Sequence, residues 1–247
     1  MPLTLNELYT QTKHQYHLSM IAGKTGIDHI MNWVYVSEDS STHDFLKGGE
    51  LIITTGINYQ DETSLYEFIE TMIQSHTCGM ILNTGKYILS DHITDSIKEL
   101  CDKHNYPLIN MPWEVHIYDI TRDYYNRIFM DTQKDTSITD AFLSFIENDS
   151  LHHYDALRIL EDNHFEKDDC YEIVLMKCNK KVISDDLKLR LHFLMESFVK
   201  LNDLDIHIAF YKNHFLFFMI WMKYRFMMKC LLWFLRLKIL LKSFIFM

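Results

Sequence analysis

The sequence predicts an α/β fold, with an N-terminal three-layer domain built on a mainly parallel sheet, followed by an incomplete α+β domain. The first observation is that short apolar segments alternate with helical segments, which is the pattern of βαβ units. The second is that the apolar segments are almost continuously hydrophobic, as strands are when helices cover both faces of a parallel sheet. A chain of 247 residues, 48% of them hydrophobic, is long enough to bury such cores.

The first half of the chain carries these signals in clear alternation. Thr4 and Glu7 have the spacing of a capping box, so a helix is expected to start there and to end before Gly23. The later helical segments have apolar residues at helical spacing, and the strand segments are rich in β-branched and aromatic residues. We expect helices at residues 3–23, 41–49, 61–79, 91–105 and 114–133, and strands at 31–38, 50–56, 79–85 and 106–112.

The second half begins after a junction that we expect at residues 131–140. An apolar strand, an amphipathic helix and the start of a hairpin with a turn at Lys212-Asn213 suggest a second, α+β domain. We expect helices at 141–163 and 184–203, a strand at 170–179 and the hairpin at 206–218. The predicted domains are residues 1–130, a helical connector at 131–150, a partial α+β domain at 151–217 and an atypical tail at 218–247.

Composition excludes several classes of protein. Five cysteines without a CxxC spacing indicate reduced thiols, and neither a disulfide framework nor a zinc site is expected. The histidines form no HExxH motif or tight cluster, so the sequence predicts no metal site. It predicts no cofactor and no catalytic residues. A net charge of −10 does not favour nucleic-acid binding. No signal peptide opens the chain, and a cytoplasmic location is expected.

Two strands share an ending that suggests a binding site. The segments "LIITTG" and "MILNTG" both place Thr-Gly directly after an apolar strand. Ligands of open α/β sheets bind beyond the carboxyl ends of the strands, where backbone N–H groups and short hydroxyls can bind a polar planar ligand or a carboxylate. The alternative is that the glycines only supply positive φ for turns. The candidate ligand-binding residues are Glu38, Thr54, Thr55, Gly56, Asn83, Gly85 and Trp113.

The order of segments resembles the N-terminal domain of the purine catabolism regulator (PucR) family of bacterial transcription factors. The resemblance covers roughly residues 4–130 and is carried by "AGKTGIDHIMNWVYVSE", "FLKGGELIITTG", "CGMILNTGKYI" and "YPLINMPW", of which "GGELIITTG" is the most specific. It implies a domain that senses a small metabolite, followed by a GGDEF-like middle domain without cyclase activity. In this family a helix-turn-helix at the far C-terminus binds DNA.

The resemblance therefore implies the ligand-sensing portion of a regulator of purine or nitrogen catabolism, and not an enzyme. The expected partners are a small-molecule effector related to purine catabolism and a second copy of the chain in a homo-oligomer. DNA is expected as a partner only if a helix-turn-helix is supplied elsewhere, since the chain is expected to be a truncated form. A small α/β enzyme using the same sheet edge is the alternative, as is a membrane-associated signalling protein anchored by its tail.

The C-terminal tail has an unusual composition. Residues 206–247 contain seven Lys or Arg and no Asp or Glu, and basic residues interrupt the apolar run too often for a membrane span. We interpret residues 218–247 as the product of a shifted reading frame. A basic helix lying on a membrane surface and an ordinary core segment are the alternatives.

Overall fold

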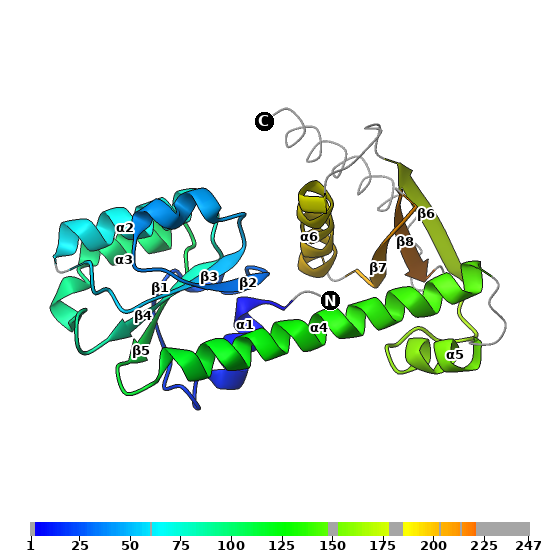
Figure 1. Ribbon diagram of the computed structural model, residues 1–247, viewed down its shortest axis with the longest axis horizontal. Coiled ribbons are helices and arrows are strands. Elements are labelled where there is room, and N and C mark those ends of the chain that lie inside the picture. Colours follow the sequence, from blue (N-terminus) through cyan, green and yellow to red (C-terminus); the bar gives the residue numbers. More distant parts are fainter. Residues whose placement is uncertain are drawn as a thin grey trace. The chain divides into compact units, whose positions relative to one another are not determined.

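A five-stranded sheet lies at the centre of the first part of the chain (Figure 1). The computed structural model describes residues 3–59, 61–147, 153–177, 185–202, 204–212 and 214–220. The chain divides into two compact units, with the boundary between Gln133 and Lys134.

The sheet of the first unit has the strand order β1-β5-β4-β3-β2. The four strands from β2 to β5 run parallel to one another, and β1 pairs with β5 in the antiparallel direction. The mainly parallel sheet expected from the sequence is thereby confirmed. The strands are β1 (Ser19–Ala22), β2 (Trp33–Val36), β3 (Glu50–Thr54), β4 (Gly79–Thr84) and β5 (Leu108–Pro112).

Helices cover both faces of this sheet, which makes the three layers. Figure 1 shows α2 and α3 on one face, and α1 with the first part of α4 on the other. In β3, Ile52 packs towards α2 and α3 while Leu51 and Ile53 pack towards α1 and α4, and all three are fully buried. Burial on both faces explains why the strand is a continuous apolar run. The helices are α1 (Leu5–Thr12), α2 (Glu62–Gln74), α3 (Asp95–Lys103) and α4 (Ile117–Ile146), with short 3₁₀ helices η1 (Lys24–Gly26), η2 (Ser40–Phe45) and η3 (Ser90–His92).

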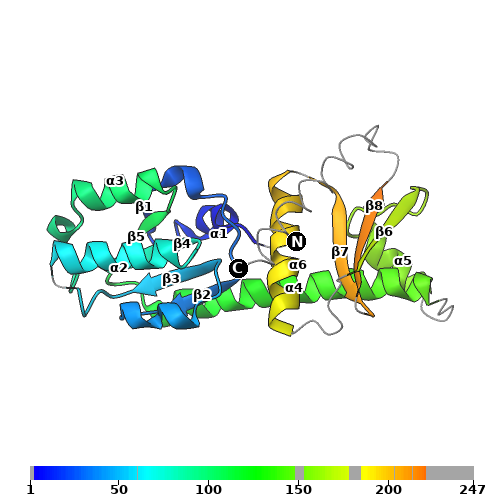
Figure 2. The same ribbon diagram turned by 90° about the horizontal axis from the view of Figure 1, so that it is seen from above.

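The second unit is built on an antiparallel sheet with the order β6-β8-β7. Figure 2 shows α6 alongside this sheet, where its apolar side chains pack on β7 and β8. Side chains of α5 and of the last turns of α4 pack on the other face. This mixture of helices and antiparallel strands agrees with the α+β class expected from the sequence. The elements are α5 (His153–Glu161), β6 (Tyr171–Lys177), α6 (Asp185–Leu201), β7 (Ile206–Tyr211) and β8 (His214–Ile220).

The predicted helix at residues 3–23 is wrong in its second half. The capping box is present, because Thr4 Oγ1 accepts from the Glu7 amide and the Glu7 carboxylate accepts from the Thr4 amide. The helix, however, ends at Thr12, and His17 takes a positive φ of 49°. The following residues form β1, which pairs with β5. Tertiary pairing with a distant strand therefore overrides the local helical pattern.

The predicted helix at residues 41–49 is shorter than expected and of another type. It is the 3₁₀ helix η2, and Gly48 and Gly49 follow it with φ of 93° and 80°. The glycines were expected to end the helix directly. Instead η2 ends at Phe45, and Gly48 and Gly49 form the turn that leads the chain into β3.

The predicted junction at residues 131–140 contains the boundary between the two units, at Gln133 and Lys134, but α4 continues through it without a break. This segment is polar but contains neither Gly nor Pro, so nothing in it interrupts a helix. Ile138, Ala141 and Phe142 then bury the end of α4 in the core of the second unit. The predicted helix at 141–163 is correspondingly divided between α4 and α5.

Residues 218–220 of the predicted tail belong to the end of β8. The rest of the tail lies outside the described residues, as does Asn213 of the predicted turn. Within the described ranges, no helix is long and apolar enough to cross a bilayer.

Candidate functional site

The loops that follow the four parallel strands lie along one edge of the first sheet. Thr54 pairs in register with Leu82, and Thr84 with Pro112, so the strand ends are level with one another. The sequence expectation that the two Thr-Gly endings share an edge is therefore correct. The candidate residues at this edge are Glu38 after β2, Thr54, Thr55 and Gly56 at the end of β3, Asn83 and Gly85 at the end of β4, and Trp113 after β5.

The carboxylate of Glu38 closes the loop after β3. It accepts hydrogen bonds from the Thr54 hydroxyl at 2.7 Å, from the Thr55 amide at 2.6 Å and from the Gly56 amide at 3.0 Å. The Asn58 side-chain amide donates to the Glu38 backbone carbonyl at 2.8 Å. The two amides of Thr55 and Gly56, called here the amide pair, thus surround one carboxylate. The sequence interpretation left these donors open to a ligand, whereas in the structure they are bound by the protein itself.

Gly56 is required by packing as well as by conformation. Its φ is 70°, a region that residues with a side chain rarely adopt. A Cβ at this position would lie 2.1 Å from Cγ1 of Ile88, which is fully buried. The loop after β3 therefore packs directly against the loop after β4, and Gly56 itself leaves no open space for a ligand.

Asn83 joins the ends of β4 and β5. Its side chain is 2% exposed, and Nδ2 donates to the Pro112 carbonyl at 2.9 Å. Gly85 has a φ of 113°, and its amide donates to the Ile88 carbonyl at 2.8 Å. Asn83 is therefore a structural bridge beneath the edge, and Gly85 allows the turn that brings residues 86–88 back over it.

A cation and two aromatic rings lie at this edge beside Gly85. Lys86 Nζ is 4.7 Å from the centre of the Trp113 ring and 4.9 Å from that of Tyr87, and the two rings meet edge to face at 5.5 Å. Lys86 is exposed and Trp113 is half-buried. Sequence reasoning singled out Trp113 but missed Lys86 and Tyr87, although they follow "NTG" directly. The exposed ammonium group of Lys86 is a positive charge that an anion could approach at this edge, beside two partly buried rings.

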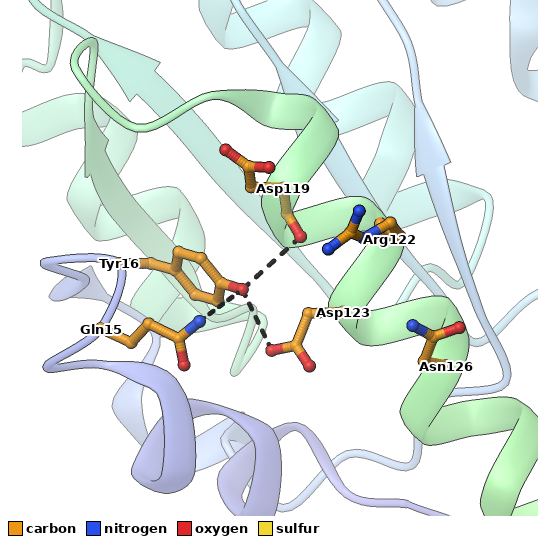
Figure 3. Close-up of a pocket in the computed structure, with 6 residues that line it drawn as sticks. All are labelled: Gln15, Tyr16, Asp119, Arg122, Asp123 and Asn126. Carbon is orange, nitrogen blue, oxygen red and sulfur yellow. Dashed lines mark hydrogen bonds between the residues drawn. The ribbon is translucent and has the colours of Figure 1, made fainter.

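A polar pocket of about 360 Å³ lies elsewhere in the first unit (Figure 3). Figure 3 shows the Tyr16 ring facing α4, where its hydroxyl donates to Asp123 Oδ2 at 3.1 Å and accepts from Gln15 Nε2 at 2.8 Å. Burial, reinforced by the charge of Asp123, raises the pKa of Tyr16 to about 12. The hydroxyl therefore stays protonated at neutral pH. The pocket is lined by Gln15, Tyr16, Asp119, Arg122, Asp123 and Asn126, none of which the sequence analysis identified.

The second unit brings together side chains that could hold a metal ion. One ligand atom from each of Asp135, His192 and Glu196 lies within 4.8 Å of the other two. Asp135 is far in sequence from the other two residues, and the spacing of His192 and Glu196 matches no recognised metal-binding motif. The sequence therefore predicted no metal site. Beside them, His207 is buried, and burial lowers its pKa to about 4 although the charge of Asp135 acts in the opposite direction.

Comparison with known proteins identifies relatives of the first unit. Residues 7–128 match the purine catabolism regulatory protein-like family. Over 103 residues the chain is 30% identical to the purine catabolism regulatory protein of Bacillus subtilis (strain 168). That alignment covers 41% of this chain and 19% of the relative, so the match spans about a fifth of the relative's length. The family match falls entirely within the unit that contains the parallel sheet.

Proposed function

From the match of residues 7–128 to the purine catabolism regulatory protein-like family, we propose that this chain is the ligand-sensing portion of a transcriptional regulator. The sensing unit is Pro2–Gln133, which contains the matched residues. The effector is a small planar anion derived from purine breakdown. That class follows from the name of the relative and from the chemistry of the sheet edge.

The amide pair carries this proposal. Its two N–H groups, together with the Thr54 hydroxyl, are already arranged around a carboxylate at distances of 2.6–3.0 Å. An effector carboxylate entering this position would make the same hydrogen bonds that Glu38 makes, so the number of hydrogen bonds lost on exchange is small. Donors held in place before binding favour affinity, because little ordering remains to be done.

The planar part of the effector is assigned to the neighbouring cation and rings. Trp113 offers a ring face for stacking, and Lys86 offers a positive charge above it. The loops after β3 and β4 are in contact through Gly56 and Ile88, so the two halves of the site adjoin. A ligand with a carboxylate at one end and a conjugated ring at the other fits this order of groups.

Exchange of the carboxylate would give the unit a response to the effector. Glu38 links the segment after β2 to the turn after β3, and this link would open when a ligand takes its place. The segment that would be released continues into η2, which starts at Ser40. A ligand that binds the opened state better shifts the population towards it, which is what a sensor requires.

Isothermal titration calorimetry on the full-length chain tests the proposal. The probes are a panel of purine bases and their ring-opened carboxylates. We expect binding of at least one anionic, conjugated compound, weakened about tenfold or more by Lys86→Gln, since a charge-assisted contact is worth 1.5–3 kcal/mol. Lys103→Gln, which removes an exposed lysine from α3, is the matched control and should bind as the parent chain does. Equal binding by the Lys86 and Lys103 variants would overturn the proposed site.

The variant Glu38→Ala tests whether Glu38 competes with the effector for the amide pair or instead contacts the bound effector. If Glu38 occupies the effector position, its removal exposes the amide pair, and carboxylates bind more tightly than to the parent chain. If Glu38 contacts the effector instead, the same change weakens binding. An absence of any binding to the panel, by either protein, would reject the assignment of a purine-derived anion.

A further inference from the structure

We propose that Asp135, His192 and Glu196 form a binding site for one divalent transition-metal ion in the second unit. The three residues come from two elements, since Asp135 lies on α4 and the other two lie on α6. Nothing in the proposed sensing role of the first unit requires this site. It is a separate property of residues 134–247.

The geometry suits a metal ion. His192 and Glu196 lie four positions apart in the sequence, which places both side chains on the same face of α6. His192 Nδ1 and Glu196 Oε2 are 3.6 Å apart. Two ligands about 2.0–2.2 Å from a tetrahedral zinc ion lie about 3.4 Å from each other, so this pair needs almost no adjustment. A carboxylate oxygen of Asp135 lies within 4.8 Å of one ligand atom of each of the other two residues.

The ring of His192 is oriented for binding through Nδ1. Its other nitrogen, Nε2, lies 3.0 Å from the Ile208 carbonyl oxygen, which can only accept a hydrogen bond. Nε2 therefore carries a proton, and a neutral ring presents the lone pair of Nδ1 to the Glu196 carboxylate. Two acceptors facing each other need either a proton or a cation between them. A metal-bound histidine commonly donates its second N–H to a backbone carbonyl in this way.

A second histidine supports Asp135. His207 Nδ1 lies 3.5 Å from Asp135 Oδ1, and Nε2 lies 2.8 Å from the Thr139 hydroxyl. The ring also stacks on Phe142, with centroids 5.7 Å apart. The His207 side chain is only 5% exposed, so it is held firmly against the carboxylate. Such supporting contacts orient a ligand and strengthen metal binding.

The ligand set selects the class of ion. Two carboxylates and one imidazole neutralise a divalent charge, and imidazole favours zinc, iron or nickel over magnesium and calcium. Side-chain exposures of 28% for His192, 16% for Glu196 and 20% for Asp135 allow an ion to enter and leave room for water as a further ligand. Zinc is the appropriate probe. The bound ion would tie α4 to α6 and so stabilise the second unit.

Calorimetric titration of zinc chloride into the chelator-treated, full-length chain is the first experiment. We expect one equivalent bound at this site, absent from His192→Gln and weakened more than about tenfold by Glu196→Gln, which keeps the shape of the side chain. His14→Gln, which removes an exposed histidine from the first unit, is the matched control and should retain the full equivalent.

Thermal unfolding distinguishes loss of ligands from loss of the fold. Zinc should raise the midpoint of the parent chain and of His14→Gln but not that of His192→Gln, whose metal-free circular dichroism should match the parent. Cobalt in place of zinc should give visible absorption bands that disappear in the same variants. Equal zinc binding by His192→Gln and the parent, or no binding by the parent, would overturn the proposal; in the second case a proton at Nδ1 accounts for the geometry.

Discussion

The carboxylate of Glu38 accepts a hydrogen bond from the backbone amide of Thr55 at a distance of 2.6 Å. This contact joins the end of β2 to the end of β3, beyond the last paired residues of the two strands, Val36 and Ile53. Together with the hydrogen bond from the Gly56 amide, it holds the loop after β3 closed at the edge of the parallel sheet. The carboxylate that holds this loop closed is also the group that the proposed effector would displace.

Removing the charge of Glu38 should destabilise the first unit. Glu38→Gln retains the shape of the side chain but cannot accept all three hydrogen bonds equally, because one oxygen becomes an NH₂ group. Hydrogen bonds to a charged group contribute about 1.5–3 kcal/mol, so we expect the free energy of unfolding to fall by about 1–3 kcal/mol in urea denaturation. Glu99→Gln on the exposed side of α3 should leave it within about 0.5 kcal/mol of the parent. Equal midpoints for the two variants would show that the Glu38 contacts contribute nothing.

Two glycine substitutions should differ because only one meets a buried side chain. Gly56→Ala would place a Cβ 2.1 Å from Ile88 Cγ1 at a φ of 70°, whereas at Gly48, with a φ of 93°, the nearest atom is 3.6 Å away. Left-handed strain alone costs about 1–2 kcal/mol. We expect about this loss for Gly48→Ala, and a clearly larger one for Gly56→Ala. Chemical denaturation of both variants measures the difference, and a smaller loss at Gly56 would contradict the close packing of the two loops.

A buried hydroxyl pair between α1 and α4 gives an asymmetric prediction. Thr12 Oγ1 donates to the Leu8 carbonyl at 2.6 Å, so its one proton is used, and the Tyr124 hydroxyl must donate to Thr12 at 2.8 Å. Thr12→Val therefore strands the Tyr124 hydroxyl, which is 1% exposed, and should cost about 1–3 kcal/mol. Tyr124→Phe leaves Thr12 bonded and should cost only about 0.5–1.5 kcal/mol. The opposite ranking in unfolding experiments would reverse the assigned direction of the hydrogen bond.

Tyr16 should make the protein sensitive to alkali. Its pKa is raised to about 12 by burial and then by Asp123, against an ordinary value of 10.0. Between pH 10 and 12 the unfolded chain releases this proton while the folded chain retains it, so stability falls as pH rises. In Tyr16→Phe, the free energy of unfolding should depend less steeply on pH in this range. At pH 8 it should be lower than that of the parent by about 0.5–1.5 kcal/mol, because a hydrogen bond is lost. Urea midpoints measured from pH 8 to 11 test this, and parallel slopes for parent and variant would refute it.

At the carboxyl edge of the sheet, sequence patterns predicted the positions of the strand ends but not the contacts between their loops. The sequence identified the four parallel strands and placed seven candidate residues at their ends, because strand polarity and direction follow from local pattern and chain connectivity. It could not show that Glu38 binds the amides after β3, since that depends on how the β2 loop folds over a neighbouring strand. Lys86 and Tyr87 could not be assigned to the same edge from the sequence, because it is the turn at Gly85 that places them beside Trp113.

The sequence by itself determined the α/β class, the parallel direction of four buried strands and the resemblance to a family of regulators. Each of these depends on patterns within short stretches of chain, where hydrophobic spacing and turn residues act locally. Only the tertiary structure decided that residues 19–22 form a strand and that the Glu38 carboxylate binds the amide pair after β3. It also decided that Asp135 lies beside His192 and Glu196. These contacts join residues separated by many positions, and their energies arise only after the core has brought the elements together.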